Sequence, residues 1–146
     1  MFSAVVVGCG FVSSLYGSTA YNHTNNFNIV GCFDIIQERA LNYAKRYHTN
    51  VYKNMSEILN DSSVDIVIVL TTADSHYELC KRIIEAGKHV YCEKPLSLTL
   101  ENSIELQTLA KRFNVQIASA PVTTCAESHA ELAKVVRSGD IGDITM

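Results

Sequence analysis

The sequence predicts an α/β protein: a Rossmann-type, doubly wound parallel sheet of about six strands with helices on both faces. Three observations lead to this prediction. Short β-branched runs alternate with amphipathic segments along the whole chain. The runs are apolar at successive positions, which is typical of strands buried on both faces. The first run leads directly into a glycine-rich turn and a helix-compatible segment. Such an alternation indicates a parallel sheet covered by helices.

The elements can be placed in order along the chain. We expect strands at residues 4–7, 28–33, near 51, and at 64–70, 89–92 and 115–119. The pattern S-x-x-E from Ser75 predicts a capping box for a helix that ends at Gly87. Thr99 is expected to cap the next helix, and Gly139 to close the last one. We expect three apolar stripes of these helices to pack into the core: His76, Leu79, Cys80, Ile83 and Ile84; Leu106, Leu109, Ala110 and Phe113; and Leu132, Val135 and Val136.

Size and composition fit one globular domain. The 146 residues are near the most common domain length, and 47% are hydrophobic while 18% are charged. The longest apolar stretch, Ile66 to Leu70, is far shorter than the roughly 20 residues that cross a bilayer. Met1 leads into the first strand without a basic leader or a small-residue cleavage site. We therefore expect a cytoplasmic protein that does not insert into membranes.

Charge and cysteine usage narrow the classes of partner. The net charge is −3 and no basic run occurs, so nucleic acid is not an expected partner. The cysteines are odd in number and widely spaced, and none forms a C-x-x-C pair, so neither a disulfide framework nor a metal site is predicted. We expect reduced, mostly buried thiols at Cys9, Cys32, Cys80, Cys92 and Cys125.

The turn after the first strand has the strand, tight turn and helix context of a dinucleotide-binding fingerprint. Gly8 would permit the tight turn, and Gly10 would let the backbone approach a pyrophosphate at the helix N-terminus. Ser13 stands where the pattern has Gly or Ala, although a serine is small enough to keep helix and strand close. The cofactor-binding residues predicted here are Gly8, Cys9, Gly10, Phe11 and Val12.

An acidic residue follows the second strand at the distance that the fingerprint requires. Asp34 would accept hydrogen bonds from the adenosine ribose hydroxyls. Its carboxylate would repel a 2′-phosphate, and residues 35–37 include neither Arg nor Lys. The sequence therefore favours NAD over NADP. The alternative for Asp34 is a surface cap of the following helix.

The segment around the fifth strand resembles a known family. The chain reads Ala86-Gly87-Lys88-His89-Val90 and then Glu93-Lys94-Pro95. These two motifs resemble those of the glucose-fructose oxidoreductase, inositol dehydrogenase and MocA (Gfo/Idh/MocA) family of NAD(P)-dependent oxidoreductases. The resemblance extends from the first strand to the G-x-I-G-like segment at 139–142, and so covers nearly the whole chain.

The resemblance implies roles for the residues of the Glu-Lys-Pro turn. Lys94 is implied to be the catalytic lysine that binds the substrate hydroxyl beside the nicotinamide, with Glu93 close to the cofactor. A cationic, proton-donating side chain at the carboxyl end of a strand suits that role, and Pro95 would stiffen the turn. The alternative is a solvated Glu/Lys turn.

The turn after the fourth strand is a second, partial match to the family. Thr71 and His76 fit its T-P-N-x-x-H pattern, whereas Thr72 replaces the proline and Ala73 replaces the asparagine. The resemblance implies that Thr71, Thr72 and His76 contact the cofactor. Packing within the helix layer is an equally open interpretation of His76. The segment 119–123 after the sixth strand is proposed only as a rim of the pocket.

The implied function is an NAD(P)-dependent dehydrogenase that acts on a hydroxyl of a sugar, polyol or nucleotide sugar. Residues 1–142 would form its nucleotide-binding domain, and 143–146 would begin a linker to a substrate domain that this chain lacks. A non-catalytic dinucleotide-binding or sensor module, or a structural remnant that binds nothing, are the alternatives. The family commonly dimerises through the second domain, which leaves a homo-oligomer open.

Overall fold

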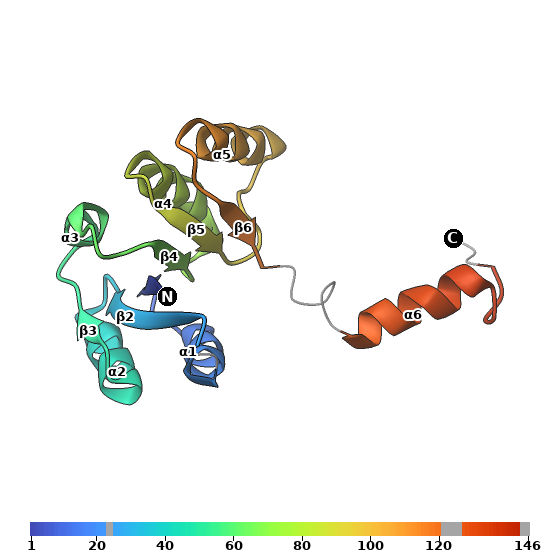
Figure 1. Cartoon of the computed structure of the whole chain (residues 1–146), viewed down its shortest axis with the longest axis horizontal. Coiled ribbons are helices and arrows are strands. Elements are labelled where there is room, and N and C mark those ends of the chain that lie inside the picture. The colour runs from blue at the N-terminus through green and yellow to red at the C-terminus, as the bar shows by residue number, and fades with distance from the viewer. Residues whose placement is uncertain (23–24, 121–126, 144–146) are drawn as a thin grey trace.

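A computed structural model of the chain describes residues 1–22, 25–120 and 127–143. Within this part, six parallel strands form one sheet in the order β3-β2-β1-β4-β5-β6, which confirms the predicted fold (Figure 1). The strand order reverses between β1 and β4, as in doubly wound folds. The strands are β1 (Phe2–Val7), β2 (Phe27–Phe33), β3 (Asn50–Val51), β4 (Ile66–Val69), β5 (His89–Cys92) and β6 (Ile117–Ser119).

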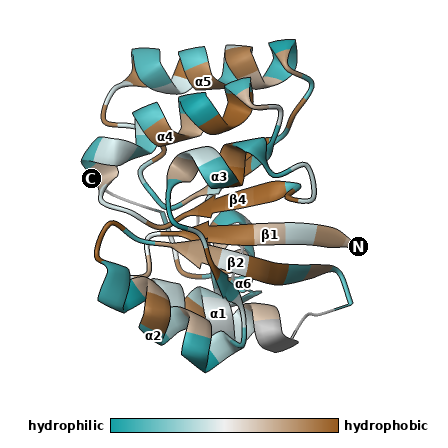
Figure 2. Ribbon diagram, turned by 90° about the vertical axis from the view of Figure 1, so that its left-hand side faces the viewer, coloured by the Kyte–Doolittle hydropathy of each residue, from teal (hydrophilic) through white to brown (hydrophobic). Residues whose placement is uncertain are grey.

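Helices cover both faces of the sheet (Figure 2). Because crossovers between parallel strands are right-handed, the two directions of winding place their helices on opposite faces. The helices α3, α4 and α5 lie on one side of the strands, and α1 and α2 on the other. The helices are α1 (Ser13–Asn22), α2 (Gln37–Tyr47), α3 (Met55–Asn60), α4 (Ala73–Glu85), α5 (Leu100–Arg112) and α6 (Glu127–Ser138).

Alternate residues of each central strand enter two separate cores. In β1, Val5 and Val7 face the core under α3, α4 and α5, whereas Ala4 and Val6 face the core under α1 and α2. All four are at most 2% exposed. Burial on both faces explains why these strands are apolar at every position.

The start of α4 corrects the prediction of a capping box at Ser75. The helix begins at Ala73, and Thr72 is its N-cap residue with extended backbone. The Ser75 hydroxyl instead donates to the Thr72 carbonyl oxygen at 2.8 Å and to Thr71 Oγ1 at 2.7 Å. The predicted cap of α5 is confirmed, since Thr99 Oγ1 accepts a hydrogen bond from the Asn102 N–H.

The core prediction is wrong for the third apolar stripe and for Phe113, which follows α5 and is 38% exposed. The helix α6 forms and Gly139 follows it with a positive φ of 80°, but none of its residues is buried. Leu132 is 56% exposed and Val135 is 37% exposed. Figure 1 shows α6 lying away from the sheet. The amphipathic pattern predicted the helix correctly, but a pattern does not specify which surface covers the apolar stripe.

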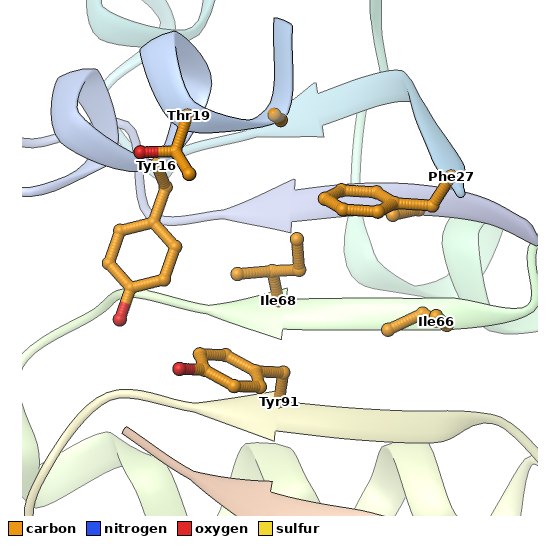
Figure 3. A pocket seen from close by; sticks show the side chains of 8 residues that line it. Tyr16, Thr19, Phe27, Ile66, Ile68 and Tyr91 are labelled. Carbon is orange, nitrogen blue, oxygen red and sulfur yellow. The ribbon is translucent and has the colours of Figure 1, made fainter. Parts of the chain in front are cut away.

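One half of the sheet keeps an open apolar face beside α1 (Figure 3). The helices α4 and α5, which connect β4, β5 and β6, both pack on the opposite face. A groove of about 290 Å³ remains here, lined by Ala4, Tyr16, Thr19, Ala20, Phe27, Ile66, Ile68 and Tyr91.

The structure also bears on two further expectations, that the thiols are buried and that the protein does not insert into membranes. The thiols of Cys9, Cys32, Cys80 and Cys92 are buried as predicted, whereas Cys125 lies outside the described residues. The neighbouring Cys80 thiol and burial together raise the pKa of Cys92 above its usual range. In the described ranges, each helix is too short or too polar to cross a bilayer.

Candidate functional site: the carboxyl edge of the sheet

Four adjacent strands bring the predicted site residues to one edge of the sheet. The strands are parallel, so their carboxyl ends meet at that edge. The turn at 8–12 follows β1, and Asp34 follows β2. Thr71 and Thr72 follow β4, and the Glu-Lys-Pro turn follows β5. The predicted site residues therefore lie together at one edge of the sheet.

Gly8 lies where the strand order reverses, and no other residue fits its position. Its φ is +94°, a conformation that side chains with a Cβ rarely adopt. A Cβ at this position would lie 2.7 Å from the carbonyl carbon of Leu70 and 2.8 Å from the backbone nitrogen of Thr71. Gly8 N–H also donates to the Phe33 carbonyl oxygen at 2.9 Å. The turn is thus held against the ends of both neighbouring strands.

The rest of the turn presents backbone donors to open space. A Cβ built on Gly10 would meet no atom within 4 Å. Within the described residues, the N–H groups of Gly10, Phe11 and Val12 have no acceptor, as is usual at the start of a helix. Such groups, together with the positive end of the helix dipole, attract phosphate oxygens. The replacement by Ser13 is accommodated: the residue is 2% exposed, and its hydroxyl donates to the Gly10 carbonyl oxygen at 2.6 Å.

Asp34 is bound to the glycine-rich turn through its side chain. Its Oδ2 accepts a hydrogen bond from the Cys9 N–H at 2.7 Å, and its Oδ1 accepts one from the Ile36 N–H at 2.7 Å. The carboxylate is half-buried beside the turn. Each oxygen keeps a further lone pair, so the carboxylate can hold the turn and still accept from a ligand hydroxyl.

His76 connects the turns after β4 and β5. It lies in the first turns of α4 and is 1% exposed. Its Nδ1 is 2.6 Å from the Pro95 carbonyl oxygen, and its Nε2 is 3.0 Å from the Thr71 carbonyl oxygen. A ring buried in this way orders both turns, and its atoms are not accessible to a ligand.

The Glu-Lys-Pro turn presents an oriented carboxylate and an exposed cation. Glu93 Oε2 accepts a hydrogen bond from the Lys94 N–H at 2.8 Å. The Lys94 side chain is exposed, and in the described part of the chain its ammonium group has no hydrogen-bond or ion-pair partner. The peptide bond between Lys94 and Pro95 is cis.

Tyr16 is a residue of this site that sequence reasoning missed. It lies on α1, one turn after Ser13, and its hydroxyl donates to Glu93 Oε1 at 3.0 Å. Burial and the neighbouring Glu93 raise the pKa of Tyr16 above its usual range. The contact joins residues 77 positions apart, and no local pattern in the sequence indicates it.

The A-G-K-H-V part of the family motif lies at the opposite edge of the sheet. Lys88 is 5% exposed, and its ammonium group donates to the carbonyl oxygens of Asp61 and Val64 at 2.6 and 2.9 Å. His89 Nδ1 accepts from the Gln116 N–H. These residues secure the start of β5, so only the Glu-Lys-Pro part belongs to the site. Of the proposed rim at 119–123, residues 121–123 lie outside the described residues.

Comparison with known proteins agrees with this geometry. A family model described as "Oxidoreductase family, NAD-binding Rossmann fold" (GFO_IDH_MocA) matches residues 2–121. The uncharacterized oxidoreductase YhhX of Escherichia coli is 31% identical over 96% of this chain. Inositol 2-dehydrogenase of Salmonella typhimurium is 26% identical over 98% of it. The crystal structure of an NAD-binding protein from Listeria innocua covers 97% of the chain with a TM-score of 0.89 at 31% identity.

The chain spans less than half of these relatives. It covers 42% of YhhX, 44% of the inositol 2-dehydrogenase and 42% of the Listeria protein. The match to the family model nevertheless includes every residue from β1 to the end of β6. With its glycine-rich turn at the reversal of strand order and the Glu-Lys-Pro turn beside it, the chain belongs to the Gfo/Idh/MocA oxidoreductase family and comprises its NAD-binding Rossmann domain.

Proposed function

We propose that this chain binds NAD(H) at the carboxyl edge of β1, β2, β4 and β5. The observation that carries the proposal is the glycine-rich turn. Gly8 fits against Leu70 with no room for a side chain, and the N–H groups of Gly10, Phe11 and Val12 have no acceptor in the described part of the chain. The pyrophosphate would lie on the N–H groups of Gly10, Phe11 and Val12 at the start of α1.

The remaining site residues would hold the two ends of the dinucleotide. Asp34 would accept hydrogen bonds from the adenosine ribose, and its negative charge disfavours the 2′-phosphate of NADP. Thr71 and Thr72 would contact the nicotinamide half from the end of β4, and Glu93 would do so from the end of β5. Because His76 is 1% exposed, it would contribute by ordering the two turns.

We propose further that the domain serves a dehydrogenase acting on a secondary hydroxyl of a sugar, polyol or nucleotide sugar. The supporting observation is Lys94, an exposed lysine that directly follows the oriented Glu93 in the turn after β5. Lys94 would donate a hydrogen bond to the substrate oxygen and exchange a proton with it. Bound NAD supplies the hydride acceptor for the oxidation. The inositol 2-dehydrogenase among the relatives agrees with a polyol substrate.

Titration of the chain with NADH and NADPH by calorimetry tests the binding proposal. We expect saturable binding that favours NADH. In Asp34→Ala we expect affinity for NADH to fall about tenfold or more, because hydrogen bonds to a charged acceptor are worth about 1.5–3 kcal/mol and about 1.4 kcal/mol corresponds to tenfold. The preference over NADPH should also decrease in this variant.

Asp65→Ala is the matched control. Asp65 Oδ2 accepts a hydrogen bond from the Ser3 N–H at 2.8 Å, the same kind of contact at the opposite edge of the sheet. We expect this variant to bind NADH with the affinity of the wild type. A wild-type chain that binds no NADH at millimolar concentration contradicts the proposal, as does an equal loss of affinity in both variants.

A further inference from the structure

We propose that Tyr16 is a positioning residue for the nicotinamide end of the site: its hydroxyl holds the Glu93 carboxylate in a fixed orientation. The inference rests on the proposed function and adds a residue to it. Tyr16 belongs to neither sequence motif, and its contact with Glu93 depends entirely on the fold.

The geometry accounts for both oxygens of the carboxylate. Oε1 accepts from the Tyr16 hydroxyl at 3.0 Å, and Oε2 accepts from the Lys94 N–H at 2.8 Å. The second donor belongs to the adjoining peptide and cannot by itself fix the plane of a flexible side chain. The first donor comes from a different element, α1, and therefore ties Glu93 to the body of the fold.

Tyr16 is itself well placed to act as such a support. Its ring packs edge-on against Tyr91 with 5.9 Å between ring centroids, and both rings line the groove beside α1 (Figure 3). A tyrosine hydroxyl is protonated near neutral pH, so Tyr16 is available there as a hydrogen-bond donor.

Comparison with a second tyrosine–glutamate pair shows why Glu93 depends on this contact. Tyr77 donates to Glu105 Oε2 at 2.8 Å, but there Lys81 also binds the carboxylate, through Oε1 at 2.8 Å. Glu93 has no such ion pair in the described part of the chain. Among the described residues, two neutral donors orient Glu93, and loss of the Tyr16 hydroxyl removes one of them.

Helix α1 would then contribute to binding at both the pyrophosphate and the nicotinamide end of the ligand. The N–H groups of Gly10, Phe11 and Val12, just before α1, are the proposed pyrophosphate donors, and Tyr16 lies in the first turn of α1. A shift of α1 would move the phosphate donors and the Glu93 carboxylate together. Tyr16 thereby links the glycine-rich turn to the Glu-Lys-Pro turn.

The test uses two ligands that differ at the nicotinamide end. The full 146-residue chain and Tyr16→Phe are titrated with NADH and with ADP-ribose, which lacks the nicotinamide. We expect the variant to bind NADH about two- to tenfold more weakly, the range for loss of one hydrogen bond, and to bind ADP-ribose as the wild type does. Tyr77→Phe loses the same atom at the other pair and should bind both ligands normally.

A double-mutant cycle with Glu93→Ala separates positioning from general damage. If Tyr16 acts through Glu93, Tyr16→Phe has no further effect on NADH affinity once Glu93 is alanine. Additive losses, equal losses with both ligands, or unchanged NADH binding in Tyr16→Phe would each overturn the inference while leaving the proposed function intact. A wild-type chain that binds neither NADH nor ADP-ribose overturns the proposed function, and this inference with it.

Discussion

Helices α4 and α6 carry the same kind of amphipathic pattern, yet only α4 buries its apolar side chains. In α4, His76, Cys80, Ile83 and Ile84 are at most 1% exposed. In α6, no residue is buried and Leu132 is 56% exposed. The difference shows that helical periodicity predicts a helix and its apolar stripe, whereas the position of the helix in the fold determines whether the stripe is covered.

The connection that each helix makes explains the difference. The helix α4 joins β4 to β5, two neighbouring parallel strands, so its chain must return across the sheet. A right-handed crossover of this kind packs the helix onto one face. The helix α6 follows β6, which lies at the edge of the sheet, and among the described strands it does not connect two neighbours. It also lies beyond the residues that match the family model.

The largest effect expected from this contrast is a loss of stability in Ile83→Ala. Ile83 is 0% exposed within the core under α4 and α5. Removing its side chain leaves a cavity, and the free energy of unfolding should fall by about 2–5 kcal/mol. Urea denaturation followed by circular dichroism measures the change. A loss below about 1 kcal/mol would mean that α4 is not packed as tightly as the structure shows.

Elements with local signals were predicted well from sequence. The bounds of β5 are those expected, and β1, β2 and β3 differ from expectation by at most two residues at either end. The glycine-rich turn and Asp34 lie at neighbouring strand ends, because the order of strands in a doubly wound sheet fixes which ends meet. Such features follow from residues that are close in the chain.

Features that depend on contacts between residues far apart in the sequence could not be predicted from local patterns. The role of Tyr16 requires β5 to lie beside α1, and the burial of His76 requires the Pro95 carbonyl to face α4. The capping-box prediction failed because Ser75 has the right spacing to Glu78, but the helix starts two residues earlier at Ala73. Spacing alone cannot distinguish a cap from a serine already inside the first turn.

A smaller loss of stability is expected when the ion pair that joins α4 to α5 is removed. Glu105 accepts from Lys81 and Tyr77, and these contacts hold the pKa of Glu105 below its usual value of 4.5. The stabilisation is therefore complete above about pH 4.5 and is lost as pH falls through the lowered pKa. Glu105→Gln should lower Tm slightly at pH 7, and the difference from wild type should shrink towards pH 3.

The matching control for this pair is Glu131→Gln in α6. Glu131 pairs with Lys134 at 2.6 Å, but both belong to one helix and their side chains are 68% and 69% exposed. Exposed pairs within a helix contribute little to stability, so this variant should change Tm less than Glu105→Gln does. A larger shift in Glu131→Gln would indicate that α6 carries charges important to the folded domain.

The smallest loss of stability is expected when an apolar side chain of α6 is shortened. Leu132→Ala removes as many side-chain atoms as Ile83→Ala, but from a side chain that is 56% exposed. Substitutions at such positions usually change the free energy of unfolding by no more than about 0.5 kcal/mol. Urea denaturation of the two variants side by side makes the comparison direct. A loss of about 2 kcal/mol or more in Leu132→Ala would show that α6 packs against the domain in solution, and the distinction between α4 and α6 would then have to be withdrawn.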